Sequence, residues 1–214
     1  MIAQAGAIEG ATFKDGHLHY RVIGNIRPKG ICGSGLVDLV AVLLQCGVID
    51  HEGLIRPPRK RSAKSLSPRI VNHSGVNDFL IASAEESYNN RPIYLTQKDI
   101  REFQLAKGAI AAGIKTLMND IGIGVQDIHH VYLAGALGNY ADPYSTMRTG
   151  LIPRVNPQII RSLGNAASTG ASLVLLAKSY WQTVAKLAQF IEHVELSYRS
   201  DFNQYFINHM NFPS

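Results

Sequence analysis

The sequence predicts an α/β domain in which short strands run through glycine-rich turns into helices. Residues 129–134, HHVYLA, form a strand candidate that leads into a Gly-x-x-Gly turn. Residues 159–171, IIRSLGNAASTGA, repeat this plan with a second short strand and glycine turn. Residues 97–121 carry apolar side chains at helical spacing for about six turns. Strand–turn–helix junctions of this kind are the places where open α/β sheets bind ligands.

Length and composition exclude several classes of protein. With 214 residues, 46% of them hydrophobic, the chain can bury a real core in one large domain or two small ones. No apolar run is long enough to span a membrane, and the start, MIAQ, has no leader character, so the simplest interpretation is a cytoplasmic protein without a membrane partner. Two cysteines cannot supply four ligands to a zinc or iron–sulfur centre, and a disulfide framework is equally disfavoured.

The positive charge is concentrated in one stretch. Residues 56–69, RPPRKRSAKSLSPR, contain six basic residues and no acid, which leaves 15 basic and 16 acidic residues in the remainder. Such a run could bind phosphates, but it holds no aromatic residue on which bases could stack. We therefore expect a solvated, mobile loop and no nucleic-acid partner.

The N-terminal segment predicts a β-hairpin. Alternating residues flank Asp15-Gly16, a pair that tolerates the positive φ angles of a tight turn. His17 and His19 fall on one face of the second strand, but no third ligand is near in the sequence. We interpret both histidines as ordinary strand positions and predict no metal site.

A glycine-rich turn then leads into a buried helix. Glycines at 30, 33 and 35 precede the apolar run 36–44; Ser34 is a plausible N-cap and Gly47 a C-terminal stop. Free backbone N–H groups at such a helix start suit an anion, which makes Gly33, Ser34 and Gly35 candidate phosphate contacts. The lysine of a P-loop is missing, and close packing of helix on sheet explains the glycines equally well.

Strand candidates at residues 79–83 and 91–95 precede the long helix, whose start carries a capping-box pattern at Thr96 and Asp99. Gln104 and Lys107 lie off its main apolar line, where they could reach a ligand or simply face solvent. After the strand at 129–134, Pro143 is expected to stop the chain's regular structure. The second junction predicts one long helix, and the tail predicts one more strand and a short aromatic-rich helix.

Several ordered blocks together resemble the C-terminal domain of the reductive activators of corrinoid proteins. The blocks are GICGSGLVDLVAVLL, LTQKDIREFQLAKGAI, VYLAGALGNYADP, GLIP, GNAASTGA and the ending HVELSYRSDF…FINHMNFP. These activators belong to the superfamily of acetate and sugar kinases, heat-shock chaperones and actin. The likeness covers nearly the whole chain except the basic segment.

The resemblance implies a ribonuclease-H-like α/β fold, that of the actin-like ATPases, with a mixed sheet and packed helices. It implies a domain that binds ATP or ADP with Mg²⁺ and drives an electron from a ferredoxin-like [2Fe–2S] domain to a Co(II) corrinoid protein, the partner. By motif, Gly135, Ala136 and Gly138 match the adenosine motif, and residues 164–170 match the second connecting helix. Gln104 and Lys107 fall where the superfamily's nucleobase and ribose contacts arise.

The chain departs from the family in what it lacks. The Asp-x-Gly-Thr motifs that hold phosphates and Mg²⁺ have no counterpart here, and neither do the iron–sulfur cysteines. We therefore expect residues 1–214 to be a C-terminal portion holding the adenosine half of the site, with no catalytic residue and no metal ligand of its own. The phosphate-binding half and the iron–sulfur domain would lie elsewhere, so we expect the isolated chain to be inactive.

Two other hypotheses stay open. The apolar helices and the aromatic tail could make the chain a non-catalytic interaction module or a homodimer interface of the same superfamily. A small-molecule kinase would need the missing aspartates and a substrate pocket, and nothing in the sequence offers either.

Overall fold

The computed structural model describes residues 1–213, apart from the side chains of Ala136, Leu137 and Asn139. Its N-terminal sheet contains β1 (Ala7–Lys14), β2 (His17–Val22) and β3 (Gly30–Ile31), in the order β2-β1-β3. β1 and β2 are antiparallel and joined by Asp15 and Gly16, whose φ angles of 52° and 80° are those of a tight hairpin turn. The predicted hairpin is confirmed, and β3 adds to it in parallel.

Helix α1 (Gly33–Cys46) packs on β1 and buries its apolar run as predicted. Gly47 ends the helix in the left-handed conformation, and its N–H donates to the carbonyl of Leu44. The expected N-cap is wrong. Ser34 lies within the first turn and Cys32 takes the cap position, because the helix begins directly after β3 and Leu36 N–H donates to the Cys32 carbonyl.

A second, antiparallel sheet holds β4 (Ile70–His73), β5 (Val76–Ala82) and β6 (Ile93–Leu95) in chain order. The predictions at 79–83 and 91–95 are confirmed as β5 and β6. β4 was not predicted, because its short sequence IVNH has neither length nor clear alternation. Phe79 and Leu95 are fully buried and join the same core as α1 and β1.

The basic segment differs from the expected solvated loop. Its second half forms a 3₁₀ helix, η2 (Arg61–Arg69), that buries Ala63 and Leu66 in the main core. The Arg69 guanidinium donates to the carbonyl of Ile81 at 2.9 Å. Two buried apolar residues among the cations therefore fix this segment to the body, while most of its charges face solvent.

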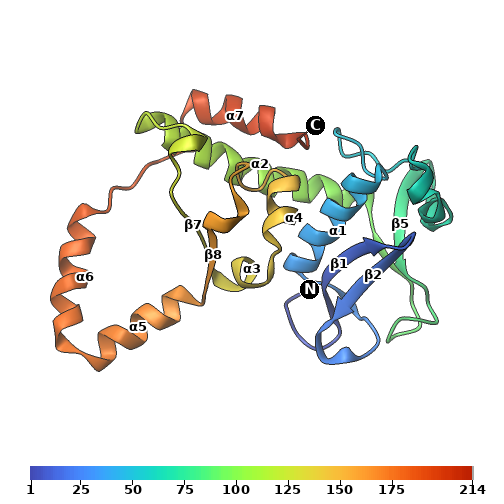
Figure 1. Cartoon of the computed structure of the whole chain (residues 1–214), viewed down its shortest axis with the longest axis horizontal. Helices are drawn as coiled ribbons and strands as arrows, with labels where there is room; N and C mark the ends of the chain where they lie inside the picture. Colours follow the sequence, from blue (N-terminus) through green and yellow to red (C-terminus); the bar gives the residue numbers. More distant parts are fainter. Residues whose placement is uncertain (214) are drawn as a thin grey trace.

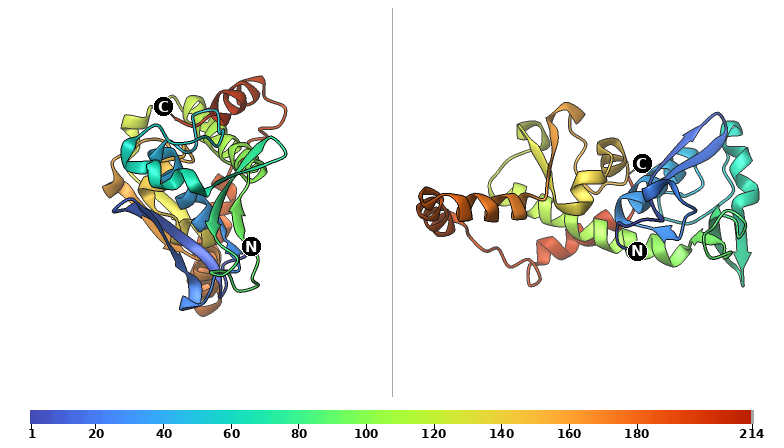
Figure 2. Two further views of the ribbon diagram at one scale, coloured as in Figure 1. Left: turned by 90° about the vertical axis from the view of Figure 1, so that its right-hand side faces the viewer. Right: turned by 90° about the horizontal axis from the view of Figure 1, so that it is seen from below.

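Helix α2 (Gln97–Asp120) is the longest element, and the predicted capping box is present: the Asp99 N–H donates to the Thr96 hydroxyl oxygen, and the Thr96 N–H to the Asp99 carboxylate. The C-terminal helix α7 (Ser200–Met210) lies along α2 (Figure 1). Residues 191–199, where the tail was expected to form a strand, contain none. They instead lead the chain back to α2 (Figures 1 and 2).

A parallel pair of strands, β7 (Val131–Ala134) and β8 (Ile160–Gly164), forms the third sheet. Between them lie α3 (Gly135–Tyr140) and α4 (Pro143–Arg148). Pro143 begins α4 instead of stopping regular structure, because Asp142 caps the helix and proline suits the first helical position. β7 is also less buried than expected. Short 3₁₀ turns complete the chain: η1 (Ile23–Asn25), η3 (Val125–Asp127) and η4 (Pro157–Ile159).

The predicted long helix after β8 is two helices, α5 (Ala166–Leu176) and α6 (Lys178–Phe190). Ala177 between them is extended, with φ −143° and ψ 120°, which breaks the helical path. The two helices extend away from the body as an arm (Figure 1), and in the described chain neither of them buries a residue. No helix within residues 1–213 has the length and apolar character required to cross a membrane.

Candidate functional site

The two glycine turns predicted as βα junctions lie side by side. β7 and β8 are parallel, and Ala134 at the end of one pairs with Gly164 at the end of the other. The chain then turns into α3 at Gly135 and toward α5 at Gly164, with φ angles of 85° and 61°. Both helices therefore start at the same edge of the sheet, where open α/β folds bind ligands.

The two glycines of the first turn serve different purposes. A Cβ on Gly138 would lie 2.8 Å from the carbonyl carbon of Leu133, so the return of α3 against β7 requires glycine there. A Cβ on Gly135 would meet no heavy atom of the described residues within 4 Å, which leaves the backbone open to an approaching group. Ala136, predicted between them, lies outside the residues whose side chains are described.

The second junction carries its own cap. The Asn165 side chain accepts a hydrogen bond from the N–H of Ser168 at 3.1 Å, which fixes the start of α5. Apart from the half-buried Ala166, the small residues of this helix are exposed. Their surface is open for a neighbour.

The glycine-rich start of α1 has a clear packing role. A Cβ on Gly35 would lie 2.1 Å from the carbonyl oxygen of Ile8, so the helix touches the backbone of β1 at this glycine. Ser34 is buried, and its hydroxyl lies 3.4 Å from the Cys32 thiol. Gly33 lines a cavity of about 490 Å³ whose walls come from β3, α1, β6, the start of α2 and the chain start, not from the turn after β7.

Gln104 and Lys107 are not solvated surface residues, because only 3% and 1% of each is exposed. The Gln104 amide donates to the carbonyl of Met210 at 3.1 Å, and the Lys107 ammonium donates to the carbonyl of Asn211. The two side chains therefore hold the C-terminal segment against α2. Burial lowers the pKa of Lys107 to about 8.

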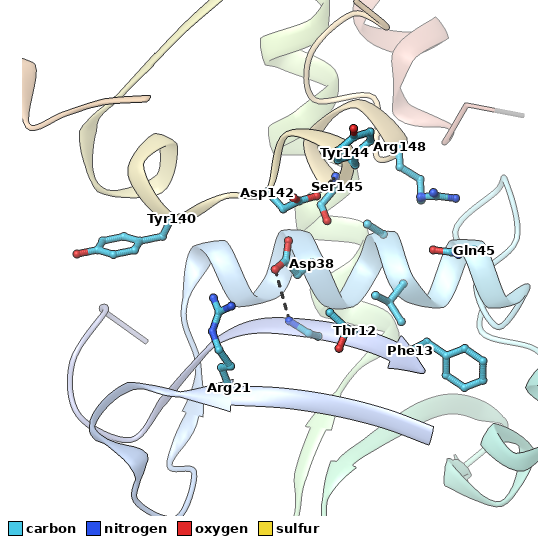
Figure 3. Close-up of a pocket in the computed structure, with 13 residues that line it drawn as sticks. Thr12, Phe13, Arg21, Asp38, Gln45, Tyr140, Asp142, Tyr144, Ser145 and Arg148 are labelled. Carbon is cyan, nitrogen blue, oxygen red and sulfur yellow. Dashed lines mark hydrogen bonds between the residues drawn. The ribbon is translucent and has the colours of Figure 1, made fainter. Parts of the chain in front are cut away.

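A cleft of about 500 Å³ lies between β1, α1 and the α3–α4 segment, and the sequence interpretation missed it (Figure 3). Asp38 of α1 points into it, and Asp142 and Ser145 face Asp38 from the opposite wall (Figure 3). Burial raises the pKa of Asp38. The hydrogen bonds of Ser145 and of the Ala11 amide to its carboxyl lower that pKa, and the nearby charge of Asp142 raises it. The sequence holds one sign of this cleft, because Asp38 is an acid within the otherwise apolar run 36–44.

The described residues offer no metal centre of their own. No group of three or more histidine, cysteine, aspartate or glutamate side chains in residues 1–213 is arranged to hold a metal ion. His17 and His19 lie in β2, the strand predicted for them, and both side chains are exposed. Cys32 and Cys46 are both buried and unpaired, so no disulfide links them.

Comparison of this chain with known proteins, by sequence and by structure, points to a single family. The whole chain, residues 1–214, matches the family model described as the C-terminal domain of RACo, the ASKHA domain. It is 36% identical over 198 residues to the corrinoid activation enzyme RamQ of Eubacterium limosum, covering 92% of this chain and 33% of that enzyme. It is 25% identical over 185 residues to the Co(II) methylated amine-specific corrinoid protein reductase of Methanosarcina barkeri, covering 86% and 29%.

A solved structure agrees with these matches. The reductive activator for a corrinoid, iron–sulfur protein superposes with a TM-score of 0.89 at 32% identity, over all of this chain and 33% of that one. The chain thus spans about a third of the length of its relatives. Its mixed α/β architecture is that of the ASKHA, or actin-like, domain, as predicted. The chain belongs to the family of ASKHA domains found in the reductive activators of corrinoid proteins.

Proposed function

We propose that this chain is the C-terminal nucleotide-binding portion of a cytoplasmic, ATP-dependent reductive activator whose partner is a corrinoid protein. The observation that carries the proposal is the pairing of Ala134 with Gly164, which sets two glycine turns and two helix starts side by side. The names of the relatives support the choice of partner, because one is a corrinoid activation enzyme and the other a corrinoid protein reductase.

The chain's residues fit the adenosine end of ATP or ADP. The open backbone at Gly135 allows close approach of a nucleoside, and Gly138 keeps α3 tight against β7 beneath it. We assign Gly135, Ala136 and Gly138 to this contact. Gly33, Ser34 and Gly35, predicted as phosphate contacts, pack α1 against β1 or line a different cavity, so the proposal does not use them. The polar groups of Gln104 and Lys107 already bond the C-terminal carbonyls, so the proposal does not depend on them.

Mg²⁺ and the [2Fe–2S] cluster do not fit this chain. Mg²⁺ binds one or two carboxylates together with substrate phosphates, and the Asp-x-Gly-Thr motifs that would hold both are absent from this chain. A [2Fe–2S] cluster takes four cysteine thiolates, and the chain has two cysteines, both buried. We therefore assign phosphate and metal binding to the other two thirds of the full-length activator. The same part would carry out the electron transfer to Co(II) that ATP hydrolysis drives.

Calorimetric titration with ADP tests the nucleotide site. We expect weak binding that Gly135→Val reduces at least tenfold, because a branched side chain at φ 85° both strains the turn and covers the open backbone. Gly122→Val is the matched control, since Gly122 has a φ of 70°, has equally open surroundings and lies at the end of α2. Equal affinity in the two variants would contradict the assignment.

A phosphate-release assay tests the division of labour. Because phosphoryl transfer depends on positioned phosphates and Mg²⁺, we expect no significant ATP turnover by residues 1–214 alone. Robust Mg²⁺-dependent turnover by the purified chain would overturn the proposal that the phosphate half lies elsewhere.

A second candidate function is a non-catalytic interaction or dimerisation module, favoured by the arm of α5 and α6. Its large apolar side chains face solvent; Leu176 is 84% exposed and Phe190 81%. Exposed apolar surface of this kind marks interaction sites. Trp181 is the single tryptophan and lies on the arm. A concentration-dependent change in its fluorescence, with dimerisation in sedimentation and no ADP binding, would favour this function over the first.

A further inference from the structure

A second cavity, of about 320 Å³, lies between the second half of α2, the turn η3, the segment 150–154 after α4 and the end of α7. We call it the α2–α7 cavity. Its walls are mostly apolar: Ile114 and Met118 come from α2, Val125 from η3, and Ile152 and Pro153 from the segment after α4. Four segments far apart in the sequence thus enclose a space of the size and apolar character of small-molecule sites.

The α2–α7 cavity is separate from the proposed nucleotide site. β7 and β8 are parallel, and the two glycine turns follow the ends of these strands. The cavity is lined instead by Gly124 and Val125, which precede β7, and by Ile152 and Pro153, which precede β8. Within residues 1–213, it shares no lining residue with the cleft of Figure 3. A ligand in it would therefore not occupy the place proposed for adenosine.

The ionisable side chains at this cavity are all basic. Lys115, Arg154 and His209 line it, and no aspartate or glutamate of residues 1–213 does. The carboxylate of Asp127, in η3, accepts a hydrogen bond from the Gly124 N–H at 2.8 Å and does not line the cavity. Basic groups at the edge of a water-poor, apolar space attract anions. The charge and the walls together select a ligand that carries a negative group on an apolar body.

Two of the basic groups have donors available for such a ligand. Lys115 is exposed, and its ammonium group makes no hydrogen bond or ion pair with any other residue of 1–213. The Nδ1 atom of His209 lies 2.7 Å from the carbonyl oxygen of Tyr205. Because a carbonyl oxygen can only accept, Nδ1 carries a proton, and Nε2 is the ring atom left for a ligand. Nε2 donates to an anion when the ring is protonated.

We propose that the α2–α7 cavity binds a small amphipathic carboxylate. Its apolar body lies among Ile114, Met118 and Ile152, and its carboxylate lies at the rim against Lys115 and His209. A neutral apolar molecule would leave the basic groups unused, and a small hydrophilic anion would leave the apolar walls unfilled. The inference goes beyond the proposed function and does not depend on it, because the glycine turns do not line this cavity.

The test is a titration of the 214-residue chain with octanoate, followed by methyl NMR. We expect saturable shifts of the methyl groups of Ile114, Met118 and Ile152. Octan-1-ol and octylammonium have the same chain length without the negative charge, and both should bind about tenfold more weakly. Ile191, which is 75% exposed and follows the arm, is the internal control for adsorption to exposed apolar surface, and its methyl groups should not shift.

Two pairs of variants at exposed positions test the rim and the walls separately. Lys115→Glu reverses the charge at the rim and should weaken octanoate binding about tenfold. Lys98→Glu makes the same change in α2 away from the cavity and should leave the affinity unchanged. Val125→Trp places a large side chain at the edge of the cavity and should abolish the methyl shifts. Gln126→Trp, at the next position and outside the lining, should not.

The outcomes that overturn the proposal are distinct. Absence of saturable shifts in the wild type, or shifts confined to Ile191, would show that the cavity does not bind octanoate. Equal affinity for octanoate and octan-1-ol, or for the Lys115→Glu and Lys98→Glu variants, would show that the basic groups do not select an anion. Shifts of the cavity methyl groups by ADP and not by octanoate would identify a nucleotide site instead. Failure of ADP to bind anywhere leaves the octanoate result interpretable.

Discussion

Lys107, near the middle of α2, donates a hydrogen bond to the backbone carbonyl of Asn211, 104 positions later in the chain. Its ammonium group also lies 5.1 Å from the centre of the Phe212 ring. The side chain is 1% exposed, and burial is the cause of its lowered pKa. Among residues 1–213, this buried lysine thus holds the C-terminal segment through a carbonyl and an aromatic ring and makes no ion pair.

The first prediction concerns pH. The pKa of Lys107 is about 8 in the folded chain, against 10.5 for an ordinary lysine, so between these values the unfolded state binds the extra proton. The free energy of unfolding should therefore rise with pH from 8 to 10.5, by about 3 kcal/mol at most. Below pH 8 both states are protonated and this dependence disappears.

Urea denaturation of the wild type and of Lys107→Met over this pH range measures the effect. Methionine keeps most of the volume but cannot titrate, so the rise should be absent in the variant. Because other groups titrate equally in both proteins, the difference between the two curves isolates Lys107. Parallel curves would show that the lysine keeps an ordinary pKa.

A second prediction concerns Gln104, whose amide donates to the carbonyls of Glu52 and Met210. Gln104→Ala removes this donor from two partly buried hydrogen bonds and leaves the Met210 carbonyl without it, whereas Arg101 still donates to the Glu52 carbonyl, so the variant should cost about 1–3 kcal/mol in the free energy of unfolding. Gln182→Ala, on the exposed face of α6, serves as control and should change it by no more than about 0.5 kcal/mol. A cost below that of the control would show that the C-terminal segment does not depend on Gln104.

Sequence reasoning succeeded where a few neighbouring residues decide the structure. The hairpin at Asp15-Gly16, the capping box at Thr96 and the helix end at Gly47 all depend on partners within four residues. The two βα junctions were also predicted, because apolar runs and glycine turns are local signals. The family resemblance then supplied the domain type, which the comparisons confirm.

The sequence did not predict structure that depends on contacts between residues far apart in the chain. No local pattern shows that the carbonyls bonded by Gln104 and Lys107 come from residues 210 and 211. The break at Ala177 has no proline or glycine to announce it. The cleft at Asp38 depends on α4, more than a hundred residues later, so only the isolated acid in an apolar run marked it.

A third prediction separates packing from ligand binding at the start of α1. Gly35→Ala would place a Cβ 2.1 Å from the Ile8 carbonyl oxygen and force α1 away from β1, at a cost of about 1–3 kcal/mol. Gly170→Ala, in helix α5 with no heavy atom within 4 Å, should instead stabilise by about 0.5–1 kcal/mol. Thermal denaturation of both variants tests this, and equal effects would contradict the close approach at Gly35.

The fourth prediction concerns Asp38 itself. Its pKa is raised in the folded chain, so as pH increases the unfolded state loses its proton first and the folded state becomes less stable. This loss of stability is complete once the pH exceeds the pKa of Asp38 in the folded chain. The charged carboxylate then destabilises the folded state. Asp38→Asn removes the charge while keeping an oxygen that can accept from Ala11. The variant should therefore be more stable than the wild type at pH 7, and the difference should shrink as the pH falls through the folded pKa. Urea midpoints at pH 7 and pH 4 measure both parts, and a less stable variant at pH 7 would show that the negative charge of Asp38 is satisfied in the isolated chain.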